Sequence, residues 1–230
     1  MAKIISTSCI VCQNRSDIFN SLGPEELEAV NCQRISVHYN AGEVIFKQGT
    51  PCYYFVCITS GLVKLYLENE NSHNIIIGLA RPVDYIFMPG AYVNYRHQFT
   101  AVACEDTTAC LIESDIWHDL IKTNPNFAND FIRKMSLQSI ELIDKISSIT
   151  QKQVFGRMAD VLIYLSKNIY FQDSFTLTLS RQDLADFSGM TKESAIRAMK
   201  KFKEDQIISL KGNNIEILNP FLLETISKNG

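Results

Sequence analysis

The spacing of hydrophobic residues changes near residue 126. Before that point, from about residue 32 to residue 113, short apolar or alternating runs are separated by turn residues such as Gly42, Gly49 and Gly61. Runs of this length are typical of antiparallel strands in a sandwich or barrel. After that point, apolar residues return every three or four positions, as they do on one face of a helix. The sequence therefore predicts an α+β protein with a β-rich N-terminal part.

A long helix is predicted where the spacing changes. Its apolar stripe comprises Phe127, Phe131, Met135, Gln138, Leu142, Ile146 and Ile149. A helix over residues 126–151 would be about 39 Å long at 1.5 Å per residue, which exceeds the width of a small domain. Packing on its own domain is the simpler interpretation, but this length favours pairing with the same helix of a second chain in a parallel coiled coil. We therefore expect a homodimer.

Composition excludes several classes of protein. With 230 residues, 46% of them hydrophobic and 20% charged, the chain can form two small domains. The longest apolar stretch, residues 75–80, is far shorter than the ~20 residues that cross a bilayer, and residues 1–12 contain no signal core. The seven cysteines are odd in number, which favours free, buried thiols over a disulfide framework. We expect a cytoplasmic protein that does not enter a membrane.

Residues 180–217 carry the pattern of two helices followed by a hairpin. Ser180 can cap a first helix, with Asp183 near the positive end of its dipole. Gly189 supplies a tight turn, and Thr191 can cap a second helix that runs to about residue 205. This is the helix-turn-helix pattern. The hairpin at residues 210–217 (LKGNNIEI) is typical of a wing that touches phosphate.

The second of these helices is predicted to expose side chains that can contact bases. Glu193 and Arg197 lie one turn apart; a carboxylate can accept from cytosine N4, and a guanidinium can donate twice to guanine. The same spacing also forms an ordinary surface pair of about 0.2–0.5 kcal/mol, so spacing alone leaves both interpretations open. Although the net charge is −3, residues 180–212 hold seven basic and five acidic side chains. The predicted DNA contacts are Arg181, Lys192, Glu193, Ser194, Ile196, Arg197, Lys200 and Lys211.

Three separate motifs resemble the CRP/FNR family of bacterial transcription regulators. Residues 39–49 (YNAGEVIFKQG) resemble the entry to the family's β-roll, and residues 55–66 (FVCITSGLVKLY) resemble the hairpin that follows. Residues 179–185 (LSRQDLA), residues 189–194 (GMTKES) and Arg197 resemble its winged helix-turn-helix. The resemblance covers nearly the whole chain in the right order, which makes it specific.

The resemblance implies a fold and a set of partners. It implies a double-stranded β-helix (β-roll or jelly roll) sensor domain over residues 1–125, a dimerisation helix over 126–152 and a winged helix-turn-helix over 153–230. It further implies that a homodimer binds an inverted repeat in double-stranded DNA and contacts RNA polymerase. Glu193 and Arg197 match the pair that binds a TGA-type half-site, while Ile196 stands where relatives often carry serine or glycine.

The β-roll is not expected to bind cyclic AMP in the usual manner. Relatives that do so hold the phosphate with arginine followed by serine or threonine, and here that place is taken by Gln98 and Phe99. Without this pair a phosphodiester loses its charge-assisted bonds, although Arg96 stands close enough in sequence to be an alternative. The candidate effector pocket therefore comprises Tyr85, Ile86, Arg96, Gln98 and Phe99, for a small molecule that stays unidentified.

Oxygen-sensing relatives hold an iron–sulfur cluster with three N-terminal cysteines and one central cysteine. Cys9 and Cys12 form a C-x-x-C pair, and Cys104 or Cys110 is a candidate central ligand, but Ile18 stands near the place of the third N-terminal ligand. A single C-x-x-C pair is a weak metal signal, so a remnant of a metal site is the favoured interpretation. The cofactor stays unknown.

Haem sensing and catalysis are the remaining alternatives. His73, His97 and Met88 are conceivable haem ligands, but they form no motif. The sequence contains no His-x-His pair of the kind used by metal-dependent β-barrel enzymes, no nucleophile elbow, no phosphate-binding loop and no His-Glu-x-x-His helix. We therefore predict no enzyme activity. A dimeric ligand-binding protein without DNA activity also stays open, as do the target genes and the choice between activation and repression.

Overall fold

The computed structural model describes residues 8–69, 73–86 and 88–230. Its internal contacts divide the chain into two compact units. Unit 1 comprises Met1–Glu68 and Leu79–Ile140, and unit 2 comprises Asn69–Gly78 and Glu141–Gly230. In the part of the chain that the model describes, no helix is both long and apolar enough to cross a membrane.

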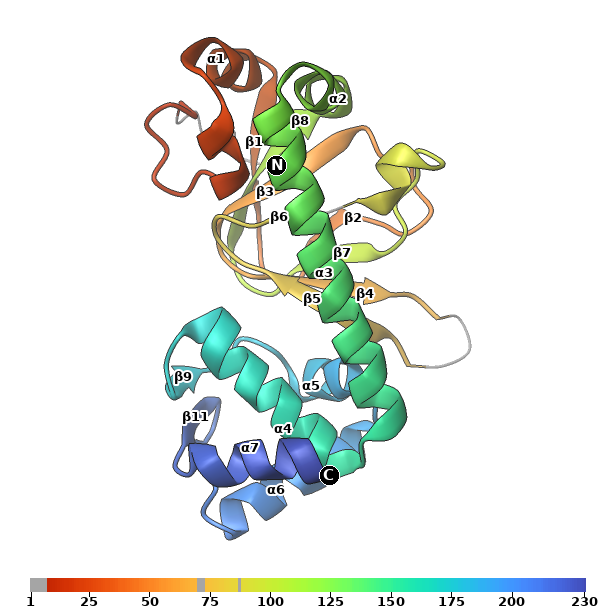
Figure 1. The fold of residues 1–230 in the computed structure, drawn as a ribbon. Helices are drawn as coiled ribbons and strands as arrows, with labels where there is room; N and C mark the ends of the chain where they lie inside the picture. The colour runs from red at the N-terminus through yellow and green to blue at the C-terminus, as the bar shows by residue number, and fades with distance from the viewer. Residues whose placement is uncertain (1–7, 70–72, 87) are drawn as a thin grey trace. The chain divides into compact units, whose positions relative to one another are not determined.

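The N-terminal part contains two four-stranded antiparallel sheets (Figure 1), as the predicted α+β fold requires. The strand orders are β1-β8-β3-β6 and β2-β7-β4-β5. The strands are β1 (Arg34–Tyr39), β2 (Val44–Phe46), β3 (Tyr54–Ser60), β4 (Val63–Leu67), β5 (Ile75–Ala80), β6 (Tyr85–Ile86), β7 (Thr100–Ala103) and β8 (Thr107–Glu113). Gly42, Gly49 and Gly61 all have positive φ, which explains why these turns use glycine.

Short helices close unit 1 around an aromatic core. They are η1 (Asp17–Ser21), α1 (Pro24–Cys32), η2 (Pro89–Tyr92) and α2 (Ser114–Thr123). Trp117 of α2 is fully buried and stacks on Phe55 of β3, with ring centroids 4.4 Å apart. Its ring also meets Phe19 at 5.6 Å and Phe127 at 5.3 Å, both edge to face. These contacts fix α2 against β3 by packing of large apolar surfaces.

The long helix α3 (Pro125–Gln151) is present, but the prediction that its whole stripe faces a partner is wrong. Phe127 and Phe131 are buried in unit 1, where both lie against Trp117. The first turns of α3 therefore complete their own unit's core. Two members of the predicted stripe, Leu142 and Ile146, stay exposed at 44% and 55%. Ile132 and Ile143, which lie outside that stripe, are also exposed, at 60% and 63%.

Unit 2 is built from helices and a three-stranded sheet of order β10-β11-β9. Its elements are α4 (Val154–Tyr164), η3 (Leu165–Tyr170), β9 (Ser174–Thr176), α5 (Arg181–Ser188), α6 (Lys192–Glu204), β10 (Ile208–Lys211), β11 (Asn214–Ile217) and α7 (Pro220–Asn229). The chain changes from α to π geometry at Leu165, where α4 ends. Strand β9 follows and comprises only three residues.

All seven cysteines are free thiols, as predicted. Cys9, Cys52 and Cys57 are buried, but Cys32 is exposed at the end of α1, so the expectation of burial is wrong for that residue.

Candidate nucleic-acid interface

The first helix of the motif, α5, is held at its start by a reciprocal cap. The Ser180 hydroxyl accepts from the Asp183 backbone N–H at 3.1 Å, and Asp183 Oδ2 accepts from the Ser180 backbone N–H at 2.9 Å. Two backbone donors that the helix leaves without partners are thereby satisfied. The helix buries its own apolar residues Leu184, Ala185 and Phe187.

The turn after α5 depends on glycine and on a residue far away in the sequence. Gly189 has φ +61°, and a Cβ built on it would lie 3.2 Å from Cγ1 of Ile149. The backbone N–H of Met190 donates to Ala185 O at 3.0 Å, and Arg157 of α4 donates to Gly189 O at 2.6 Å. This role of Arg157 could not be predicted from the sequence, because nothing local connects the residue with a carbonyl 32 residues away.

The second helix, α6, begins at a cap and presents two chemically different faces. The Thr191 hydroxyl accepts from the Ser194 backbone N–H at 3.3 Å. The inward face is apolar and buried, and consists of Ala195, Ala198, Met199 and Phe202. It packs beside α5, which gives the two helices a shared core.

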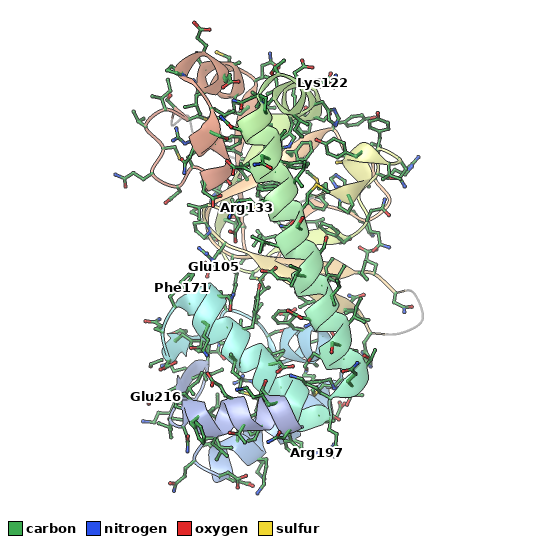
Figure 2. The ribbon with its side chains drawn as sticks, viewed as in Figure 1. Glu105, Lys122, Arg133, Phe171, Arg197 and Glu216 are labelled. Atoms are coloured by element: carbon green, nitrogen blue, oxygen red, sulfur yellow. The ribbon has the colours of Figure 1, made fainter. Side chains whose placement is uncertain are left out.

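The outward face of α6 carries most of the predicted DNA contacts. Lys192, Glu193, Ile196, Arg197 and Lys200 are exposed, and Ser194 is half-buried. Figure 2 labels Arg197 on this helix.

Local hydrogen bonds involve two of these side chains, Glu193 and Arg197. Bonds from the backbone and from Thr191 at the start of α6 hold the pKa of Glu193 below its usual value, so its carboxylate is an acceptor at neutral pH. The Arg197 guanidinium lies 3.5 Å from the Ser194 hydroxyl, which is a weak bond, and the arginine is exposed. The helix thus presents one exposed acceptor and one exposed fork of donors.

The hairpin after α6 is a small wing. Strands β10 and β11 pair in antiparallel register from Ile208↔Ile217 to Lys211↔Asn214, with Gly212 at φ +62° in the turn. Lys211 is exposed at this turn. Arg181 is half-buried and donates to Gly212 O at 2.8 Å, which ties the start of α5 to the tip of the wing. All eight predicted contacts therefore lie on α5, α6 or the wing of unit 2.

Comparison with known proteins assigns both parts of the chain. Residues 36–124 match the model of a cyclic nucleotide-binding domain, and residues 156–226 match that of a Crp-like helix-turn-helix domain. The chain belongs to the CRP/FNR family of transcription regulators. The predicted resemblance and fold class are thereby confirmed.

Individual relatives agree with this assignment. The chain is 28% identical over 192 residues to Electron transport regulator A of Shewanella oneidensis, covering 82% of this chain and 76% of the relative. It is 24% identical over 225 residues to the nitrogen fixation regulation protein FixK of Bradyrhizobium diazoefficiens, covering 95% and 93%. The solved structure of FixK2 from Bradyrhizobium japonicum shares the fold, with a TM-score of 0.78 at 20% identity over 84% of this chain and 96% of that one.

The predicted effector residues of this CRP/FNR member fall into two groups. Tyr85, Ile86 and Phe99 are buried in the packed interior. Arg96 and Gln98 are exposed in one loop, where Arg96 donates to Gly49 O at 2.7 Å and Gln98 donates to Arg96 O at 3.1 Å. The loop thus uses polar groups of both side chains for its own structure. These five residues do not provide the arginine–hydroxyl pair that holds a cyclic phosphate.

The residues suggested for a metal cofactor do not fit one. Ile18 is 1% exposed and offers no donor atom at the place of a third N-terminal cluster ligand. Among the residues that the model describes, no three His, Cys, Asp or Glu side chains are grouped so as to hold a metal ion. His97 is buried and stacks on Phe46 with ring centroids 3.9 Å apart, and Met88 is buried with its sulfur 3.5 Å from the Cys52 sulfur. Burial lowers the pKa of His97 to about 4, so its ring is neutral at pH 7.

Proposed function

We propose that this protein is a homodimeric transcription regulator that binds an inverted repeat in promoter DNA and responds to a cytosolic signal through its β-roll. The observation that carries the proposal is the exposed, oppositely charged pair Glu193 and Arg197 on the first turns of α6. A helix of this kind enters the major groove with its N-terminal residues against the bases. There a carboxylate and a guanidinium one turn apart match cytosine N4 and guanine O6 and N7 of neighbouring base pairs.

The remaining predicted contacts have distinct roles in this proposal. Lys192, Lys200 and Lys211 are exposed cations that suit phosphate oxygens, which position a protein on DNA without specifying sequence. Arg181 holds the wing tip through Gly212 O, and Ser194 lies beside Arg197. Ile196 is 46% exposed on the outward face, where an apolar side chain suits a thymine methyl group.

The exposed face of α3 supports pairing of two chains. Ile132, Ser139, Ile143 and Ile146 follow one another at intervals of 7, 4 and 3 residues, which keeps them on one side of the helix. All four are exposed. A second copy of α3 would cover this stripe, and the two-fold symmetry of such a dimer requires an inverted repeat in the DNA. Contact with RNA polymerase belongs to the same proposal.

The signal is proposed to differ from cyclic AMP bound in the usual manner, because Gln98 and Phe99 replace the phosphate-holding pair and Phe99 is buried. A ligand controls such a dimer only if it binds two of its states with different affinity. In this proposal, residues 1–125 form the sensor domain, residues 126–152 form the dimerisation helix and residues 153–230 form the DNA-binding domain.

Selection from a random-sequence duplex pool at a stated salt concentration tests the proposal. The wild-type protein should enrich an inverted repeat with a TGA-like half-site. Arg197→Ala should cost about 1–3 kcal/mol on that repeat and relax one base position. Equal weakening on every sequence would instead make Arg197 a phosphate contact.

A matched variant controls for changes in charge and helix stability. Lys201→Ala/Asp205→Ala removes an exposed lysine–aspartate pair, with N–O distance 2.8 Å, from the last turn of α6. This variant should enrich the same repeat as the wild type, whereas Glu193→Ala/Arg197→Ala should lose it. Failure of the wild type to enrich any sequence, after both aerobic and anaerobic purification, would refute DNA recognition by α6.

A further inference from the structure

Three cysteine thiols gather around one arginine in unit 1, outside the predicted effector and DNA-contacting residues. Cys9 and Cys12 lie in the segment before η1, and Cys110 lies on β8. Cys9 interacts electrostatically with Cys12 and with Cys110, and Cys110 interacts with Cys12, so the three thiols lie near one another. Arg34 of β1 donates to Cys110 Sγ at 3.6 Å and lowers the pKa of Cys9 and Cys110, although burial raises both by more.

The segment that carries Cys12 is held in place by bonds to two other elements. The backbone N–H of Cys9 donates to Asn31 Oδ1 at 3.0 Å, and the Asn14 amide donates to Thr59 O at 2.8 Å. Asn31 belongs to α1 and Thr59 to β3, so these bonds keep the C-x-x-C segment beside the sheet. Cys12 and Cys110 of β8 thereby line the same cavity, although they are 98 residues apart in the sequence.

The cavity has a volume of about 390 Å³. Its described lining contains one guanidinium and no carboxylate side chain; the other polar groups are amides and hydroxyls. It is lined by Val11, Cys12, Gln13, Asn14, Arg34, Ser36, Thr59, Ser60, Thr108 and Cys110. Its size is within the range of small-molecule sites, and its charge suits a small molecule that bears carboxylates.

Two thiols on opposite segments of a cationic cavity have a defined chemistry. We propose that Cys12 and Cys110 form a redox-active dithiol that exchanges with a low-molecular-weight disulfide bearing carboxylate groups. Cys9 and Cys57 are the neighbouring thiols, but both are buried and neither lines the cavity. Cys12 and Cys110 are both half-buried. In this proposal Cys12 attacks the disulfide, and Cys110 completes the exchange beside the Arg34 guanidinium.

The exchange proceeds in two balanced steps. The Cys12 thiolate attacks one sulfur of the small disulfide; that S–S bond breaks, and one small thiolate leaves and takes up a proton. The Cys110 thiolate then attacks Cys12 Sγ of the mixed disulfide, and the second small thiolate leaves and is protonated. The protein loses two protons and two electrons, and the small disulfide becomes two thiols. The reverse sequence reduces the protein again.

Peptide mapping of the full-length protein tests the assignment. The protein is equilibrated with glutathione disulfide, its remaining thiols are alkylated, and its peptides are identified by mass spectrometry. The expected product is a Cys12–Cys110 linked peptide, with two of the seven thiols lost per chain. The Cys110→Ser variant should instead retain one glutathione on Cys12. Cys32→Ser, which changes an exposed thiol on α1, should form the same linked peptide as the wild type.

The cavity's preference for anions is measured on the wild-type protein, so that no variant has to fold. Exchange is timed with anionic glutathione disulfide and with neutral hydroxyethyl disulfide at low and high salt. High salt screens the charge of Arg34, so it should lower the rate of exchange with the anionic reagent roughly ten-fold. The rate with the neutral reagent should change by less than about two-fold. Equal salt dependence would refute recognition by charge. A link from Cys110 to Cys9 or Cys57, or modification of Cys32 alone, would overturn the proposed pair. None of these outcomes depends on DNA binding.

Discussion

Lys145 of α3 is half-buried against Phe187 of α5 within unit 2. Its Nζ donates to Phe187 O and lies 3.6 Å from the centroid of the Phe187 ring. The opposing charge that acts on it is Asp160, which accepts from Lys152 at 2.8 Å and from the Ser148 hydroxyl at 2.5 Å. Burial therefore lowers the pKa of Lys145 from 10.5 to about 7 despite Asp160.

This lowered pKa makes the burial of Lys145 costly at low pH. In the unfolded chain the lysine keeps its proton up to pH 10.5, whereas in the folded chain it loses it near pH 7. Between these values the unfolded state binds more protons, so stability rises with pH. At 1.36 kcal/mol per pKa unit, the folded state is penalised by about 4–5 kcal/mol at pH 6 and by about 1.4 kcal/mol at pH 9.5.

Lys145→Met removes the ionisable group and keeps a similar volume. Its free energy of unfolding, from urea titration followed by far-ultraviolet circular dichroism, should exceed that of the wild type most at pH 6. This advantage should shrink by about 3 kcal/mol between pH 6 and pH 9.5, with a slope near 1.4 kcal/mol per pH unit above pH 7.5. Comparing two variants cancels the titration of every group that they share.

An exposed lysine provides the control for this experiment. Lys203 on α6 is exposed to solvent, so Lys203→Met should change stability by a similar small amount at every pH. A difference between Lys145→Met and the wild type that stays constant from pH 6 to pH 9.5 would refute the argument, because it would mean that Lys145 keeps its ordinary pKa in the folded protein.

Three further predictions concern the turn, the dimer and the dithiol. Gly189→Ala and Gly212→Ala each force alanine into positive φ and should each cost about 1–2 kcal/mol in thermal unfolding. Gly189→Ala should cost more, because only its Cβ meets another side chain; equal losses would refute the close approach of Ile149. Ile143→Glu should give a monomer in analytical ultracentrifugation, while Leu137→Glu, about a third of a turn away, should stay dimeric; a dimer in both would exclude the proposed stripe. Burial raises the pKa of Cys110, so closure of the mixed disulfide should speed up about ten-fold per pH unit from pH 7 to pH 8 in stopped-flow kinetics, and a flat profile would contradict that role.

Much of the DNA-binding motif was predictable because its signals are local. Ser180 and Thr191 bond to backbone groups three residues away, and Gly189 satisfies a backbone angle that other residues adopt at a cost. The short apolar runs between about residues 32 and 113 indicated strands in the same way. Such features depend on neighbours within one turn or one strand, so a single sequence contains them.

Tertiary packing decided the features that join distant parts of the chain. The spacing of apolar residues predicted one stripe on α3. In the structure, Phe127 and Phe131 pack into the aromatic core around Trp117, whereas Ile132 and Ile143 stay exposed. The periodicity of a helix defines its faces without saying which one its own unit buries.

The polar contacts show the same division between local and distant information. Arg157 reaches Gly189 O across 32 residues, and burial against α5 shifts the pKa of Lys145. Cys12 and Cys110 share a cavity only because the N-terminal segment lies against β8. The sequence by itself determined the caps, the turns and the chemistry of α6, since those depend on backbone geometry within a few residues. Tertiary packing alone decided which side chains are buried and which thiols share a cavity, because both depend on segments that are distant in the sequence.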